Sequence, residues 1–390
     1  MKSFIKFSLI SVLFQTGHAA NIQSGYIVTL KSSTEGNALE DHIERVRSLF
    51  GSDQHSSGKN KIKYEYRKVL LGYSAEFTDD VLAKVKAMPE VAAVEKDQLI
   101  ESSDVQENSP WGLARLSSED RLTDNEHLWS YNHDPRAGDG VDVFVVDSGI
   151  ETLLPEFQGR AYWGANLVND ISVDETGHGT HIAGIIGSKT YGVAKSSTLI
   201  AVKVIDGTGF GPASVFIAGV DWAVQNKLDG RGCVINVSLR VGRWDIINNA
   251  VGAAVDSGCV VTVCAGNDNS DACFYSPASE PRAITVGASN LDDKRAYFSN
   301  WGTCLDVFAP GEDIVSTSID GGNYNMSGTS MATAHVAGLV ANIMSSTGNY
   351  EPPSIYASIM LYSKFGKLDN IGEGSPNLLA SNIDLLQLWY

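Results

Sequence analysis

From residue 111 onward, short apolar runs alternate with longer segments in which apolar residues recur at helical spacing. The apolar runs with the length of buried strands are residues 141–146, 199–205, 234–239 and 260–265. The helical segments between them include residues 178–187, 214–225 and 246–257. Strands that alternate with helices form a parallel sheet with helices on both faces. This pattern therefore predicts an α/β fold in which chemistry gathers at the carboxyl ends of the strands.

A smaller unit precedes this region. Its expected strands are residues 25–30, a second pattern ending at 73–77, and 91–95, and its expected helices are residues 38–50 and 81–88. The order β-α-β-β-α-β predicts a small α+β domain of the ferredoxin-like type. Residues 101–109 are polar and break the pattern, so we interpret them as an exposed linker, where proteolysis concentrates.

The N-terminus has the features of an export signal. Lys2 and Lys6 precede an apolar stretch at residues 7–14, and Gly17 and Ala19 supply small residues where a signal peptidase cleaves. The stretch is too short to span a bilayer. We therefore expect a secreted, extracellular protein with a signal peptide at residues 1–19, a small domain at 20–103 and a larger domain at 104–390.

Charge is divided unevenly between these parts. Residues 1–103 carry 13 acidic and 13 basic side chains, whereas residues 104–390 carry 33 acidic and 16 basic ones, so the net charge of −17 lies entirely in the larger part. Because an acidic surface repels phosphate and anionic lipid, the composition argues against nucleic acid or a membrane as a partner.

The chain has five cysteines, at positions 233, 259, 264, 273 and 304. Five is an odd number, so at least one thiol is unpaired within a monomer. Export would permit disulfides. Neither a CxxC pair nor a Cys/His cluster has the spacing of a zinc site.

Three local sequences carry residues for nucleophilic chemistry. Asp147 directly follows an apolar strand in VVDSGI, His178 opens an apolar helix in GHGTHIAG, and Ser330 begins a helix in SGTSMATAHVAG. A serine hydroxyl becomes a good nucleophile when an imidazole takes its proton, and a carboxylate fixes and stabilises that imidazole. A serine at a helix N-terminus also directs backbone N–H groups at a developing oxyanion.

The order Asp, His, Ser along the chain is the subtilisin order, and the GxSxG turn of the α/β-hydrolases is absent from the sequence. The chain resembles the subtilisin family, and specifically its proteinase K-like branch, from Gly25 to the C-terminus. The resemblance implies a monomeric secreted serine endopeptidase that cleaves polypeptides through an acyl-enzyme. It also implies that residues 20–103 are an inhibitory propeptide, which assists folding and is removed on maturation.

The resemblance assigns roles to individual residues. Asp147 resembles the orienting aspartate, His178 the general base and Ser330 the nucleophile. The Asn267 side chain, in CAGND at residues 264–268, would donate a hydrogen bond to the oxyanion together with the Ser330 N–H. His181 and His335 are expected to be structural, and Ala334 and Cys264 replace a proline and a small alanine of the family.

Two segments resemble the edges that bind an extended substrate. They comprise Gly209, Phe210 and Gly211 on one side and Ser238, Leu239 and Arg240 on the other. Such an edge binds a peptide main chain with little sequence preference. Arg240 departs from the family, which has glycine there. It could attract acidic substrate side chains, narrow the cleft or point to solvent, and the sequence leaves these alternatives open.

Two further features follow from the resemblance. Asp306 and the backbone carbonyls of Pro281 and Ala283 match a calcium site of the family, and oxygen ligands suit calcium. With so few protein ligands, waters would complete the shell. Cys273 and Cys304 match a pair that is disulfide-bonded in several relatives.

Two other functions remain possible from the sequence. A catalytically silent relative would bind peptides or partners through the same cleft, and the departure at Arg240 keeps this alternative open. A secreted esterase would need a pocket for an acyl chain, which the extended substrate edges argue against.

Overall fold

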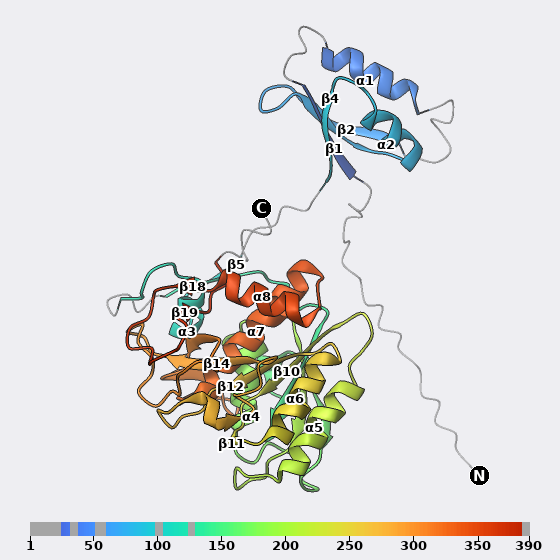
Figure 1. The fold of residues 1–390 in the computed structure, drawn as a ribbon. Coiled ribbons are helices and arrows are strands. Elements are labelled where there is room, and N and C mark those ends of the chain that lie inside the picture. The colour runs from blue at the N-terminus through green and yellow to red at the C-terminus, as the bar shows by residue number, and fades with distance from the viewer. Residues whose placement is uncertain (1–24, 32–37, 51–59, 98–103, 124–128, 384–390) are drawn as a thin grey trace, which may run out of the picture. The chain divides into compact units, whose positions relative to one another are not determined.

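The computed structural model of the protein describes residues 25–31, 38–50, 60–97, 104–123 and 129–383. The predicted signal segment at residues 1–19 lies outside these residues. The chain forms two compact units, residues 1–101 and 102–390 (Figure 1), which are described separately.

The N-terminal unit has the predicted order of elements. They are β1 (Gly25–Leu30), α1 (Ala38–Ser48), β2 (Lys61–Tyr66), β3 (Gly72–Glu76), α2 (Asp79–Lys86) and β4 (Val91–Lys96). The strands form one sheet in the order β2-β3-β1-β4, and β1 is antiparallel to both of its neighbours. Val28 and Leu30 of β1 pack with Ile43 and Val46 of α1 and Val85 of α2 in one apolar cluster. The predicted ferredoxin-like arrangement is confirmed.

The larger unit is built around a nine-stranded sheet in the order β18-β19-β15-β14-β12-β10-β7-β9-β8. Its strands are β7 (Val141–Asp147), β8 (Ala161–Asn166), β9 (Thr198–Lys203), β10 (Gly232–Val237), β12 (Val260–Cys264), β14 (Ile284–Ser289), β15 (Val307–Pro310), β18 (Lys364–Phe365) and β19 (Leu378–Leu379). All neighbours from β8 to β19 are parallel, and the short edge strand β18 is antiparallel.

Helices and short ribbons complete this unit. The helices are α3 (Trp111–Leu116), α4 (His178–Gly187), α5 (Ala213–Gln225), α6 (Asp245–Asp256), α7 (Thr329–Thr347) and α8 (Pro352–Tyr362), with 3₁₀ turns at Pro155–Phe157 and Ala272–Phe274. The two-stranded ribbons pair β5 (Asp104–Gln106) with β6 (Tyr131–His133), β11 (Val241–Gly242) with β13 (Tyr275–Ser276), and β16 (Ile314–Thr317) with β17 (Asn323–Met326).

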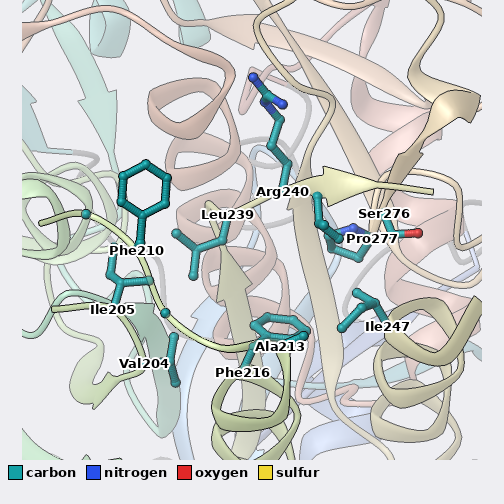
Figure 2. Close-up of a pocket in the computed structure, with 13 residues that line it drawn as sticks. Val204, Ile205, Phe210, Ala213, Phe216, Leu239, Arg240, Ile247, Ser276 and Pro277 are labelled. Carbon is teal, nitrogen blue, oxygen red and sulfur yellow. The ribbon is translucent and has the colours of Figure 1, made fainter. Parts of the chain in front are cut away.

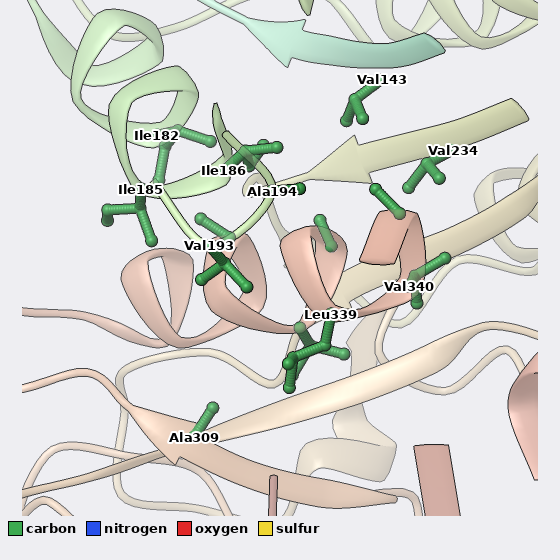
Figure 3. Close-up of a cluster of buried hydrophobic side chains, with 14 of the residues drawn as sticks. Val143, Ile182, Ile185, Ile186, Val193, Ala194, Val234, Ala309, Leu339 and Val340 are labelled. Atoms are coloured by element: carbon green, nitrogen blue, oxygen red, sulfur yellow. The ribbon is translucent and has the colours of Figure 1, made fainter. Parts of the chain in front are cut away.

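The sheet is covered on both faces because its strands are apolar on both sides. Val143 and Val145 of β7 belong to a cluster that includes residues of α4, α7 and α8. Phe144 and Val146, which point to the opposite face, belong to a second cluster with residues of α5 and α6. Figure 3 shows the first cluster gathered from β7, β10, α4 and α7, and Figure 1 shows α5 and α6 side by side. The α/β fold with helices on both faces is confirmed.

Two disulfides link parts of this unit. Cys273 is joined to Cys304, the pair that the resemblance indicated, and a second bridge joins Cys233 at the start of β10 to Cys259 just before β12. Cys264 carries the free thiol. Among the helices of the described residues, none is long and apolar enough to cross a membrane.

Candidate active site

Asp147 and His178 come together at the carboxyl edge of the sheet. Asp147 is the last residue of β7 and is fully buried, and His178 is the first residue of α4. The Nδ1 atom of His178 lies 2.7 Å from Oδ1 of Asp147. A carboxylate accepts hydrogen bonds, so Nδ1 carries the proton and Nε2 is left as the free base.

The first turn of α4 is held by a carboxylate that the sequence analysis did not single out. Buried Asp174 accepts hydrogen bonds from the Gly177 N–H at 2.9 Å and from the Thr180 N–H and hydroxyl at 2.9 and 2.7 Å. It also accepts the Ser148 hydroxyl at 2.7 Å. Asp174 therefore satisfies helix N–H groups that lack an intrahelical acceptor, and it fixes the position of His178.

A glycine at position 179 lets α4 approach β7 closely. A Cβ there would lie 2.1 Å from the carbonyl oxygen of Gly149, which no side chain could tolerate. The Gly179 N–H instead donates to the Ser148 hydroxyl at 2.9 Å. The glycines around His178 therefore allow the helix start to pack directly on the loop that follows Asp147.

The charges around His178 favour its protonated form. Burial alone lowers the pKa of His178, but the charge and hydrogen bond of Asp147, with a further contribution from Asp174, outweigh it and raise the pKa above its ordinary value. The carboxylates therefore make the imidazole a stronger base than it would be without them.

Ser330 lies in the first turn of α7 and is 92% buried at the edge of the same sheet. Its hydroxyl donates to the backbone carbonyl of Ser238 at 3.2 Å, and the Ser238 hydroxyl donates to the Ser330 carbonyl at 3.3 Å. A hydroxyl rotates readily about its C–O bond, so this proton can be redirected when a substrate arrives. The Ser330 N–H belongs to the first helical turn, where amides have no intrahelical acceptor.

Asn267 faces the start of α7 from the loop after β12. Its Oδ1 accepts the Thr329 N–H at 2.9 Å and the Thr329 hydroxyl at 2.8 Å. A backbone N–H can only donate, so the amide oxygen must face Thr329 and the NH₂ group is directed elsewhere. Sequence reasoning identified Asn267 but not the role of Thr329, although Thr329 lies within the serine motif.

Five of the six predicted substrate-binding residues line one cavity of about 360 Å³ (Figure 2), and the sixth, Ser238, does not. Gly209, Phe210 and Gly211 lie in the turn between β9 and α5, and Leu239 and Arg240 follow β10. The remaining lining residues are Val204, Ile205, Ala213, Phe216, Val241, Ile247, Ser276 and Pro277. Most of these side chains are apolar, so the cavity suits an apolar group.

Arg240 directs its guanidinium away from Phe216 and Ile247 of this cavity (Figure 2). Its Nη2 lies 2.8 Å from Oδ1 of Asp268, and its guanidinium carbon lies 5.3 Å from the centre of the Tyr275 ring. The sequence left three alternatives open for Arg240. Because its guanidinium contacts Asp268 and Tyr275, the side chain does not simply extend into solvent, which was one of them.

His181 and His335 have structural surroundings. Nε2 of His181 hydrogen-bonds the carbonyls of Ile314 and Tyr324, and Nδ1 of His335 hydrogen-bonds the carbonyl of Met331. Burial lowers the pKa of each to about 4, so both are neutral at physiological pH. Burial raises the pKa of the Cys264 thiol to about 12, which keeps that group protonated.

The proposed calcium ligand Asp306 is a buried carboxylate. Oδ2 accepts the Thr285 N–H at 2.8 Å and Oδ1 accepts the Tyr356 hydroxyl at 2.6 Å. Burial raises the pKa of Asp306. Because a carboxylate has about four lone-pair positions, two remain for a cation, so its chemistry fits a hard ion such as calcium. A cation would also offset the cost of burying this charge.

A carboxylate, an imidazole and a serine hydroxyl at one edge of a parallel sheet, beside an oriented amide, define the class of serine hydrolases. Residues 138–374 match the subtilase family, and residues 25–103 match the peptidase inhibitor I9 family. The chain therefore belongs to the subtilase family of serine proteinases, with an I9 propeptide at its N-terminus.

Several relatives are similar over nearly the whole chain. The subtilisin-like proteinase Spm1 of Pyricularia oryzae is 37% identical, over 95% of this chain and 78% of that protein. Alkaline protease 2 of Aspergillus fumigatus is 38% identical, over 94% of this chain and 82% of that protein. A crystal structure of a cold-adapted subtilisin-like serine proteinase is 39% identical, with a TM-score of 0.66, and the match covers 70% of this chain and 98% of that one.

Proposed function

We propose that this proteinase is a secreted endopeptidase that hydrolyses peptide bonds through an acyl-enzyme on Ser330. The observation that carries the proposal is the 2.7 Å contact between buried Asp147 and Nδ1 of His178, which leaves Nε2 as a base at the edge where α7 begins with Ser330. Because Asp147, His178 and Ser330 are all present, we do not favour the alternative of a catalytically silent relative.

The proposed reaction has two halves, formation of the acyl-enzyme and its hydrolysis, and each group acts once in each of them. His178 accepts the Ser330 proton as the hydroxyl attacks the substrate carbonyl, and Asp147 stabilises the imidazolium that forms. The Asn267 NH₂ and the Ser330 N–H donate to the oxyanion. His178 then gives its proton to the leaving amine, and a water molecule hydrolyses the acyl-enzyme by the same steps.

The proposed substrates are extended polypeptides. Main-chain hydrogen bonds along the segments at 209–211 and 238–240 would bind the backbone. The apolar cavity between them suits an apolar substrate side chain. Ser238, which contacts Ser330, does not line this cavity, so we expect that side chain to belong to a residue away from the cleaved bond. The net charge of −17 supports a protein without nucleic acid or membrane partners, and we propose that it acts as a monomer.

We propose that residues 1–19 are a signal peptide and that residues 20–103 are an intramolecular inhibitor and folding aid. The mature enzyme would begin near Asp104. Two observations support this division. The inhibitor match ends at residue 103, and the compact N-terminal unit ends at residue 101. Calcium at Asp306 is proposed as a structural ion that takes no part in the reaction.

The test is to express the full precursor without other proteases. The wild type should release its propeptide, and a fluorophosphonate probe should label the mature protein at Ser330. Ser330→Ala should stay an unlabelled precursor that has lost only its signal. Ser327→Ala is the matched control, because it removes a neighbouring hydroxyl that binds the Asp313 N–H outside the proposed site. Normal maturation of Ser330→Ala, or a wild type that the probe does not label, would contradict the proposal.

A further inference from the structure

We call the space between residues 238–240 and residues 264–268, beside the nucleophile, the slot, and these two segments its walls. Strands β10 and β12 are neighbours, and residues 238–240 and 264–268 continue from their carboxyl ends. The Ser238 carbonyl accepts the Ser330 hydroxyl on one wall, and Asn267 holds Thr329 on the other. At the base, Sγ of Cys264 lies 3.6 Å from the Leu239 carbonyl oxygen. A substrate carbonyl at Ser330 would lie next to both walls, so the side chain of its own residue is within reach of the slot.

Arg240 crosses from one wall of this slot to the other. Its Cδ lies 3.3 Å from the position that a Cβ on Gly266 would occupy, so the alkyl chain passes directly over the Gly266 backbone. Its guanidinium then reaches Asp268 at 2.8 Å and lies over the Tyr275 ring at 5.3 Å. The side chain is 39% exposed and has two contacts on the opposite wall, with Gly266 and Asp268, and a third contact with Tyr275.

The charge of Arg240 is compensated where it lies. Asp268 supplies a carboxylate, and the negative face of the Tyr275 ring supplies a second favourable contact for the guanidinium. A guanidinium that is already paired offers little attraction to a substrate carboxylate. The steric effect of the side chain is therefore the larger one, and a preference for acidic substrates is not expected in the wild type.

We propose that Arg240 determines specificity by closing this slot, so that the enzyme selects substrates with a small side chain on the residue that donates the cleaved carbonyl. The inference rests on the proposed peptidase function. Large side chains, such as phenylalanine, would have to displace Arg240 from Asp268, Gly266 and Tyr275 before they could bind.

The experiment uses mature enzyme and peptide p-nitroanilides that differ only in this residue, as alanine, phenylalanine or glutamate. The readout is the ratio of kcat/KM for phenylalanine to that for alanine within each variant, so a general loss of activity cancels. Arg240→Gly should raise this ratio at least about tenfold, since each fitted methylene contributes roughly that much in an apolar pocket. Arg240→Ser should act in the same direction.

Arg243→Gly is the matched control. It removes an arginine three residues further along, whose ion pair with Asp245 is longer, at 3.8 Å, and lies outside the slot. The control should leave the ratio unchanged. A smaller rise than tenfold in both Arg240 variants, or an equal rise in the control, would overturn the inference.

A second variant tests the compensated charge. Asp268→Asn should free the guanidinium, so the ratio of kcat/KM for glutamate to that for alanine should rise at low ionic strength, by roughly fivefold at most for an exposed pair. An unchanged ratio would show that Arg240 does not reach the substrate residue, and it would also overturn the inference. A wild type that cleaves none of the peptides and escapes the fluorophosphonate probe would instead refute the proposed function.

Discussion

The orientation of the Asn267 amide gives a quantitative prediction. Two hydrogen bonds fix its oxygen, one from the Thr329 N–H and one from the Thr329 hydroxyl. Thr329→Val removes the second and keeps the first. A single hydrogen bond contributes about 0.5–1.5 kcal/mol net. Because 1.36 kcal/mol corresponds to a tenfold change in rate, kcat should fall about two- to twelvefold. In serine proteases of this family, loss of the whole oxyanion donor costs about 10²- to 10³-fold.

The assay separates kcat from KM on one peptide p-nitroanilide. The oxyanion forms only in the transition state, so Thr329→Val should lower kcat and leave KM nearly unchanged. Thr329→Ser restores a hydroxyl and should recover most of the rate. Thr333→Val is the control, because its hydroxyl donates to the Thr329 carbonyl one helical turn further on. A wild-type kcat in Thr329→Val, or a loss as large as that of Asn267→Leu, would refute the reasoning.

Two further predictions concern pH and calcium. His178 must be neutral to accept a proton, and Asp147 raises the pKa of His178. Asp147→Asn should therefore reduce the rate and move the acidic limb of the profile of kcat/KM against pH to lower pH. An acidic limb that stays at the wild-type pH would contradict this assignment. If calcium binds at Asp306, a chelator should lower the thermal midpoint of the mature enzyme by about 5–10 °C, as for a ligand at 100 times its Kd, and Asp306→Asn should abolish the response. A midpoint indifferent to the chelator would remove calcium from the proposal.

The fold could be predicted from the sequence where local pattern is enough to define an element. The strand ending at Asp147 and the helix starting at His178 lie where their apolar periodicity indicated. The strands β8, β14 and β15 were not anticipated, because VFAP has only four residues and AYWGAN contains no Val, Ile or Leu. Their places in the sheet depend on contacts between distant segments, which no local pattern encodes.

The candidate site was predictable to the extent that each of its parts lies in a short motif. Asp147, His178 and Ser330 each stand at an element boundary in a recognisable sequence, whereas Asp174 is one carboxylate in a polar loop. Its only signal is its position four residues before His178. The bridge between Cys233 and Cys259 was missed because five cysteines leave several pairings possible and no local pattern selects one of them.

Two departures from the family that looked unrelated in the sequence act on the same place in the structure. Cys264 adds a sulfur at the base of the slot, 3.6 Å from the Leu239 carbonyl oxygen, and Arg240 adds a long side chain across its mouth. Both replace smaller residues, so both reduce the room for a substrate side chain. The partner that fixes Arg240 is Asp268, 28 residues further along the chain, and only the neighbouring positions of β10 and β12 bring the two together. The effect of the arginine on specificity therefore depends on sheet order, which explains why the sequence alone could offer alternatives but could not choose among them.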